Sequence, residues 1–177
     1  IREELLRLLA SSQANLLHYL EELGLLTAAI PELAQTKGVS QPKEHYWNVF
    51  DHSIHTVSAV DFLLRQGDWQ YASEKALAVV PWSARLAEHF AQEVSSGSTR
   101  RLLLKLSALL HDIAKPQTKA ADNNGRIRFL GHAKEGASTT AGILERLRFS
   151  GKEIKLVETM VRHHLRPGQM ANNELPS

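Results

Sequence analysis

A run of apolar residues that ends in a histidine and an aspartate constrains this chain more than any other feature. Residues 101–110 read RLLLKLSALL, and a helix with this sequence is apolar on every side except at Lys105 and Ser107. A helix that is apolar all round lies inside a protein. Pro116 follows shortly afterwards and prevents the helix from continuing through that point. His111 and Asp112 therefore leave the end of a buried helix together.

This position favours a metal site. A buried carboxylate is costly unless it is paired or bound to a metal ion. Imidazole and carboxylate are a usual ligand pair for Zn, Fe, Mn or Ni, so one divalent cation would satisfy both side chains. The alternative is that His111 caps the helix and Asp112 pairs with an arginine or lysine. The dipeptide is weak by itself, and its place at the end of the helix favours the metal.

Composition excludes several classes of protein. The chain has 177 residues, 43% of them hydrophobic, which is enough for the core of one domain. It contains no cysteine, which excludes disulfides and thiolate metal sites and agrees with a reducing, cytoplasmic location. No apolar run reaches the roughly 18 residues of a membrane span. The start, IREEL, has neither a signal peptide nor an initiator methionine, and we expect a fragment of a longer protein.

Charge is distributed unevenly along the chain. Residues 1–97 hold 7 Lys/Arg and 12 Asp/Glu, a net charge of −5, whereas residues 98–177 hold 14 and 7, a net charge of +7. A basic half beside a metal site suits a polyanionic substrate such as nucleic acid, although a solvated helix surface has the same composition. The residues of this predicted basic face are Arg126, Arg128, Arg146, Arg148, Lys152, Lys155, Arg162 and Arg166.

The spacing of apolar residues predicts an all-α fold. We expect helices over residues 2–10, 13–23, from a cap at Asp51 to about residue 66, 72–80, 83–95, 101–110, 132–149 and 150–164. Pro31 starts a further turn, and residues 36–44 form a loop. Asn124-Gly125 between alternating residues predicts one small β-hairpin near residues 118–129. Ser150 and Glu153 fit a capping box, and residues 169–177 are expected to form a frayed tail.

Helical phase separates two histidines near residue 51. On a helix through this segment, His52 lies about 70° from the centre of the apolar stripe and His55 about 130° from it. His52 is therefore the inward-leaning histidine and the better candidate ligand. We expect His55 to lie behind the ligands or at the surface, and His18 and His89 to have structural roles.

The order of these residues resembles the HD superfamily of metal-dependent phosphohydrolases. That pattern is a histidine, then a His-Asp pair, then a distant aspartate, on helices around a metal. His52 matches the first position, and His111 and Asp112, followed by Lys115, match the pair. The resemblance implies an HD-domain helical bundle in which His52, His111 and Asp112 bind a divalent metal ion, whether Mg, Mn, Ni, Co, Fe or Zn. Lys115 would pair with substrate phosphate as a point charge.

Further motifs resemble the neck and tail of bacterial CCA-adding enzymes and poly(A) polymerases. They are FLGHAKEGA at residues 129–137, VRHHLRP at residues 161–167, and the leucine-rich start of the chain. The resemblance implies neck-like helices over residues 1–35 and a C-terminally truncated HD-type domain over residues 45–177. It also implies a nucleotidyltransferase head N-terminal to this fragment. No aspartate follows Asp122, so we expect the usual final ligand beyond Ser177.

The roles of the later histidines stay open. His132 and His164 are either ligands of a second metal ion or acid–base and phosphate contacts, and the latter is favoured; a purely structural role is the alternative for each. His163 could replace His164, because helical phase near a terminus is uncertain by a residue or two.

Three functions fit these observations. The first is an enzyme, a phosphohydrolase that acts on the phosphate esters or 2′,3′-cyclic ends of RNA or nucleotides. The second is a non-catalytic tail module that binds tRNA. The third is hydrolysis of nucleoside triphosphates or alarmones, which the same ligands can support.

Overall fold

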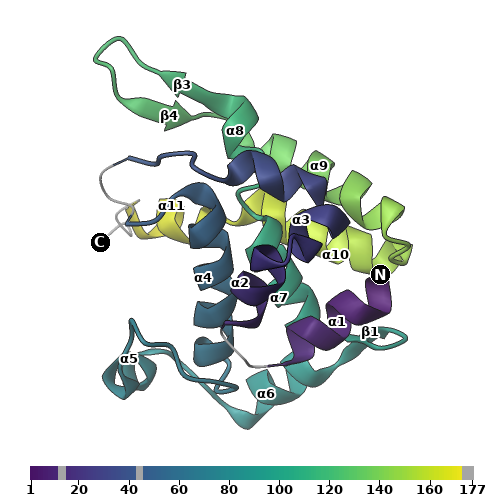
Figure 1. Ribbon diagram of the computed structural model, residues 1–177. Helices are drawn as coiled ribbons and strands as arrows, with labels where there is room; N and C mark the ends of the chain where they lie inside the picture. The colour runs from purple at the N-terminus through teal and green to yellow at the C-terminus, as the bar shows by residue number, and fades with distance from the viewer. Residues whose placement is uncertain (12–14, 43–45, 173–177) are drawn as a thin grey trace.

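Helices form most of the chain, as the leucine spacing predicts (Figure 1). The computed structural model describes residues 1–11, 15–42 and 46–172. In chain order its helices are α1 (Arg2–Ala10), α2 (Leu16–Glu22), α3 (Leu25–Ala29), the 3-10 helix η1 (Pro31–Thr36), α4 (Val49–Leu63), α5 (Glu74–Val79), α6 (Ala84–Ala91), α7 (Arg100–Leu110), α8 (Lys115–Thr118), α9 (His132–Arg146), α10 (Gly151–His163) and α11 (Arg166–Asn172). Two antiparallel ribbons, β1 (Glu93–Ser95) with β2 (Ser98–Thr99) and β3 (Lys119–Ala121) with β4 (Ile127–Phe129), complete the described part.

The apolar helix α7 lies inside the molecule, as predicted. It packs against α4 on one side and α10 on another, and α9 packs along α10. Leu103, Leu106 and Leu109 of α7 are fully buried. Leucines of α1, α2 and α3 join the same hydrophobic cluster, so the N-terminal helices share the core that carries the His-Asp pair.

Capping side chains fix where the helices begin. The Thr99 hydroxyl accepts from the Leu102 amide and starts α7, and Ser150 and Glu153 form the predicted capping box of α10. The predicted cap of α4 at Asp51 is wrong, because the Asn48 side chain accepts from the Asp51 amide and starts the helix three residues earlier. Asp51 instead lies in the first turn, where a negative charge is stabilised by the helix dipole.

The chain between α6 and α7 differs from the prediction. The helix expected over residues 83–95 ends at Ala91, and the following residues pair as the ribbon β1–β2. Gly97 turns this ribbon with a φ of 76°, a left-handed conformation that glycine adopts without strain. A polar segment of this composition indicates only a break between helices, but here its backbone groups find partners in a hairpin.

In the C-terminal third of the chain, the hairpin agrees with the prediction, but the ends of the helices differ from it. The ribbon β3–β4 is the expected hairpin, and it projects from the body of the molecule (Figure 1). Helix α9 ends at Arg146 rather than near residue 149, and Arg148 then takes a positive φ of 66°. Helix α11 covers Arg166–Asn172, so residues 169–172 of the predicted frayed tail are helical; Pro167 lies near the start of α11, where no amide donor is needed. The rest of the predicted tail lies outside the described residues.

Candidate metal centre

The end of the buried helix delivers His111 and Asp112 to one point. Helix α7 stops at Leu110, and a turn over residues 111–114 separates it from α8, in which Pro116 lies near the start. The Asp112 side chain is only 2% exposed. A carboxylate buried to this degree requires positive or hydrogen-bonding partners.

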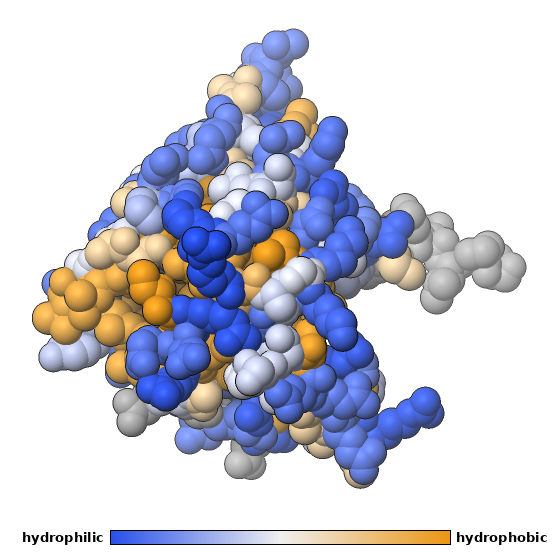
Figure 2. All heavy atoms as spheres, turned by 90° about the vertical axis from the view of Figure 1, so that its right-hand side faces the viewer, coloured by the Kyte–Doolittle hydropathy of each residue, from blue (hydrophilic) through white to orange (hydrophobic). Residues whose placement is uncertain are grey.

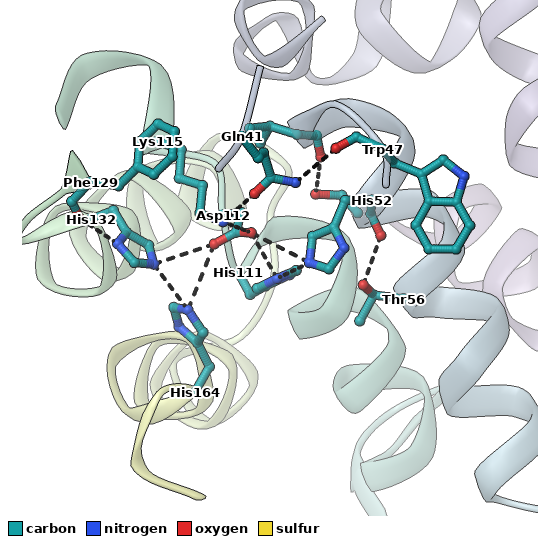
Figure 3. A network of polar contacts seen from close by, with 12 residues as sticks. Gln41, Trp47, His52, Thr56, His111, Asp112, Lys115, Phe129, His132 and His164 are labelled. Atoms are coloured by element: carbon teal, nitrogen blue, oxygen red, sulfur yellow. Dashed lines mark hydrogen bonds and ion pairs between the residues drawn. The ribbon is translucent and has the colours of Figure 1, made fainter. Parts of the chain in front are cut away.

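Four other segments of the chain bring the remaining predicted residues to the same carboxylate (Figure 3). His52 lies in the first turn of α4, and Lys115 starts α8. His132 is the first residue of α9, and His164 follows the last residue of α10. Residues far apart in the sequence therefore converge because each lies at a helix terminus that points to the end of α7.

The two oxygens of Asp112 serve different partners. Oδ2 lies 2.8 Å from Nζ of Lys115, 3.1 Å from Nε2 of His111 and 3.6 Å from Nε2 of His52. Oδ1 lies 3.4 Å from Nε2 of His132 and 3.7 Å from Nε2 of His164. Asp112 is thus shared between two pairs of histidines.

Backbone carbonyls set the tautomers of three of these histidines. Nδ1 of His111 lies 2.8 Å from the carbonyl of Ala108, and Nδ1 of His132 and of His164 each lie 2.6 Å from a carbonyl three residues earlier. A carbonyl only accepts, so Nδ1 carries the hydrogen, and in the neutral ring Nε2 is left as a lone pair. The lone pairs of three rings therefore face Asp112.

This arrangement brings the ring nitrogens of each histidine pair close together. Nε2 of His132 and of His164 are 3.2 Å apart, and Nε2 of His111 and of His52 are 3.3 Å apart. Oδ1 of Asp112 is buried without a hydrogen-bond partner in the described part of the chain. The lone pairs of His132 and His164 repel at this distance unless a proton or a cation lies between them. Nitrogen and oxygen donors of this kind suit a divalent metal ion.

Two groups of three donors meet the spacing that a metal ion needs. His52, His111 and Asp112 form one group, and Asp112, His132 and His164 form the other, with the donor atoms of each group within 4.8 Å of one another. Both groups include Asp112, so its carboxylate could contribute to either site.

Local charges shift the pKa of two of these groups. Burial raises the pKa of Asp112, but His111, His132 and Lys115 outweigh burial and bring it well below its usual value. Burial lowers the pKa of His164. Both shifts favour the forms that bind metal, an ionised carboxylate and a neutral imidazole.

Lys115 is held inside the centre. Its Nζ binds Asp112, donates to Oε1 of Gln41 at 2.5 Å, and lies 5.2 Å from the centre of the Phe129 ring. Gln41 in turn donates from Nε2 to the carbonyl of Trp47, so one side chain joins the loop before α4 to the metal centre. The sequence carries no signal for Gln41, which lies in a segment without periodicity.

The remaining histidines divide by helical phase. His163 is exposed, and its neighbour His164 is the one that turns toward Asp112. His55 lies away from the centre and stacks on Trp47, with ring centroids 4.2 Å apart. His18 lies 5.5 Å from His55, and His89 meets Phe90 edge-on.

A cavity of about 820 Å³ opens beside the centre and includes its four histidines, Asp112 and Lys115. Basic side chains also line it, two from the β3–β4 hairpin and two from α9 and α10: Arg126, Arg128, Lys134 and Arg162. Positive charge around a concave site concentrates anionic ligands there. The cavity is therefore suited to a phosphate ester.

The arrangement of histidines around Asp112 agrees with the protein family that the sequence matches. Residues 74–176 match the HD domain, and the chain belongs to this family of helical domains. The matched region includes the His111-Asp112 pair, His132 and His164, while His52 lies N-terminal to it. HD domains are generally metal-dependent hydrolases, consistent with the donors around Asp112.

Two curated relatives extend the similarity to the N-terminal helices. The chain is 36% identical over 167 residues to the CC-adding tRNA nucleotidyltransferase of Thermus thermophilus. It is 32% identical over 167 residues to the A-adding tRNA nucleotidyltransferase of Deinococcus radiodurans. Each alignment covers 93% of this chain but only 31% of the relative. The chain thus spans about a third of the length of these relatives.

The helices of the described part are too short or too polar to cross a membrane.

Proposed function

We propose that this chain is a metal-dependent phosphohydrolase domain that acts on phosphate esters of RNA ends or nucleotides, within a protein similar to tRNA nucleotidyltransferases. The observation that carries the proposal is the buried Asp112 carboxylate, which is surrounded by four imidazole nitrogens. Among the described residues, one of its oxygens has no hydrogen-bond partner. The names of the relatives support a role in tRNA maturation.

His52, His111 and Asp112 would hold one divalent ion. A bound ion would supply Lewis acidity toward a phosphoryl oxygen and toward a water ligand. Asp112 orients the donors, because both of its oxygens lie within reach of the histidines. The carbonyl of Ala108 keeps the His111 ring in the tautomer that presents Nε2.

His132 and His164 are best explained as ligands of a second ion. The sequence favours acid–base and phosphate contacts for them, but their Nε2 atoms lie 3.2 Å apart and 3.4 and 3.7 Å from Oδ1 of Asp112. Lys115 offsets the charge of Asp112 from the other side. Its Nζ is already bound to Asp112 and Gln41, so we propose that it positions the carboxylate and contributes positive charge to the cavity.

Removal of the metal provides the direct test of the proposed phosphohydrolase activity. We expect the chain, freed of metal by a chelator, to lose hydrolysis of 2′,3′-cyclic nucleotides and of nucleoside monophosphates, and to regain it when one of Mg, Mn, Ni, Co, Fe or Zn is added. The measurement is phosphate or nucleoside release, with total metal determined by mass spectrometry. Hydrolysis that continues at the same rate in chelator would contradict the proposal.

A single substitution distinguishes the two roles of His164. We expect His164→Asn to reduce the bound metal from two ions per chain to one and to lower turnover by about 10²- to 10⁴-fold. The drop in turnover follows from either role, whereas the change in metal content follows only if His164 is a ligand.

His163→Asn is the matched control, since it makes the same change one residue earlier on the exposed side. We expect it to keep both ions and the turnover. A His164→Asn variant that retains both ions while its turnover falls would assign His164 to proton transfer or phosphate binding.

The alternative function is a non-catalytic module that binds tRNA, and exposed basic residues favour it. On the side of the molecule with α1 and the α9–α10 connection, hydrophilic residues surround an apolar area (Figure 2). Arg148 and Lys152 lie exposed at this connection. Other members of the predicted basic face have acidic partners: Arg128 pairs with Asp122, Lys155 and Arg162 with Glu158, and Arg146 with Glu32.

This difference gives a test of tRNA binding. We expect the pair Arg148→Glu and Lys152→Glu to weaken tRNA binding and to lower the salt slope by about one unit for each phosphate group that is no longer neutralised. Arg146→Gln is the control, because its guanidinium already makes two hydrogen bonds to the Glu32 carboxylate at 2.7 and 2.8 Å. Unchanged affinity and slope in the double variant would exclude this surface from RNA binding.

A further inference from the structure

Four aromatic rings form a connected group that includes His55 of α4, three residues after His52 of the metal centre. Trp47 stacks on His55 with an interplanar angle of 29°, and Tyr46 meets Trp47 edge-on at 5.5 Å. Tyr71 meets both Trp47 and His55 edge-on, at 5.0 and 5.3 Å. These four residues, Tyr46, Trp47, His55 and Tyr71, are called the aromatic cluster below. They come from the loop before α4, from α4 and from the segment before α5.

The aromatic cluster is not part of the core. Tyr46 is 88% exposed and Tyr71 is 51% exposed, and neither they nor Trp47 belong to the buried hydrophobic cluster. Rings that stabilise a fold by packing are normally buried, since their stabilisation comes from removing apolar surface from water. An exposed group of rings adjacent to a functional site is more typical of a surface that binds a ligand.

Two connections join the aromatic cluster to the metal centre. His52 and His55 are three residues apart on α4, so their side chains are neighbours on the helix surface. Gln41 binds the carbonyl of Trp47 with one end of its amide and Lys115 with the other. In the view of Figure 3, Trp47 and His52 lie on the side of Asp112 opposite to Phe129 and His132. The backbone of Trp47 is therefore joined through Gln41 to Lys115, whose Nζ lies 2.8 Å from Oδ2 of Asp112.

We propose that the aromatic cluster binds the base of a nucleoside phosphate whose phosphate lies at the metal centre. The base would stack on Tyr46 and Trp47, and the placement of the phosphate rests on the proposed hydrolase function. Bases stack on aromatic side chains without regard to sequence, because every base has a π-face. The proposal defines the substrate as a nucleotide or a nucleotide at an RNA end, rather than a phosphate ester without a base.

The chemistry of the rings fits a flat, uncharged partner. Trp47 already accepts one planar ring, His55, on one of its faces. Burial, followed by the nearby His18, lowers the pKa of His55, so this ring is neutral near pH 7 and does not draw an anion to itself. Basic residues line the cavity, whereas the four rings lie outside its lining and are joined to it through His52 on α4 and through Gln41. The phosphate and the base of a nucleotide would thus meet separate surfaces.

Binding of an analogue that resists hydrolysis tests this inference. The probe is an adenosine phosphonate in which a methylene group replaces the ester oxygen, and methylphosphonate is its base-free counterpart. Both are titrated by calorimetry into the 177-residue chain with Mn²⁺ present. We expect Trp47→Leu and Tyr46→Ala to weaken binding of the adenosine phosphonate, each between about 5- and 100-fold, the range for removal of a base–aromatic stack. Binding of methylphosphonate should stay unchanged. Tyr46→Phe keeps the aromatic ring and should bind the adenosine phosphonate as tightly as the unmodified chain.

Tyr46→Ala is the deciding variant, because an 88% exposed side chain can be removed without loss of the fold. Tyr19→Ala is its matched control, since Tyr19 is a second exposed tyrosine, on α2 and outside the aromatic cluster. Equal affinity of Tyr46→Ala and the unmodified chain for the adenosine phosphonate would overturn the proposal. An equal drop in affinity for both phosphonates would also overturn it, because the effect would then lie at the phosphate.

Two further outcomes separate this inference from the proposed hydrolysis. If the rings contribute to binding but the chain hydrolyses none of the substrates, the base site stands and the hydrolase proposal falls. If the chain shows metal-dependent hydrolysis but the ring substitutions leave binding unchanged, the hydrolase proposal stands and the base site falls. A short oligoribonucleotide with a 3′-phosphonate, compared with the adenosine phosphonate, shows whether the ligand is an RNA end or a free nucleotide. Tighter ring-dependent binding of the oligoribonucleotide identifies an RNA end, and equal binding of the two identifies a free nucleotide.

Discussion

Asp112→Asn is expected to remove both metal ions and to lower phosphoester hydrolysis by more than about 10³-fold, because removal of a bound Lewis acid has a larger effect than removal of a single proton donor. The reason is geometric. Oδ2 belongs to one group of donors and Oδ1 to the other, and among the described residues neither group holds a second carboxylate. An amide has the same shape but no negative charge, and its NH₂ group would point at the lone pair of a histidine.

The measurement is metal content by mass spectrometry together with turnover, and circular dichroism reports the helical fold. Asp122→Asn is the matched control, because Asp122 lies in the β3–β4 turn and pairs there with Arg128. We expect Asp122→Asn to keep its metal and its activity. An Asp112→Asn variant with the turnover of the unmodified chain would give Asp112 a structural role, and the enzyme hypothesis would fall with it.

The second large effect concerns stability rather than activity. Lys105 is the charged residue that interrupts the apolar face of α7, and its side chain is only 2% exposed. Its Nζ lies 2.6 Å from Oδ2 of Asp61 on α4, so the two charges neutralise each other inside the core. We expect Asp61→Leu to lower the free energy of unfolding by about 3–5 kcal/mol, since it leaves a buried ammonium without its partner.

The double variant with Lys105→Met and Asp61→Leu should recover most of this stability, because hydrophobic residues of similar volume can replace a buried ion pair. Urea denaturation gives the free energy of unfolding of the unmodified chain, of Asp61→Leu and of the double variant. Glu4→Gln is the control, since Glu4 and Arg7 form an exposed pair on α1, and such pairs contribute less than about 1 kcal/mol. A small effect of Asp61→Leu alone would mean that Lys105 finds water or the carbonyl of Ser11 instead.

Features of the sequence that act over a few residues predicted most of the secondary structure. Leucine spacing identified the N-terminal helices and the buried α7, and the capping box at Ser150 located the start of α10. The errors lie at element ends, where two local solutions compete. Asn48 and Asp51 are both good caps, and the choice between them depends on which amide each side chain reaches in the folded chain.

The sequence by itself determined the donor types of the site, the His-Asp pair at the end of a buried helix, and, through the inward phase of His52, which histidine of α4 faces it. Only the tertiary structure brought His132 and His164 to the second oxygen of Asp112, chose His164 over His163, and joined Lys115 to Gln41. It also placed Arg146 against Glu32 and stacked Trp47 of the aromatic cluster on His55. The physical reason is the distance along the chain over which each interaction acts. Helix periodicity and capping act between neighbours in the chain, whereas the packing of α4, α9 and α10 around α7 decides which helix ends meet.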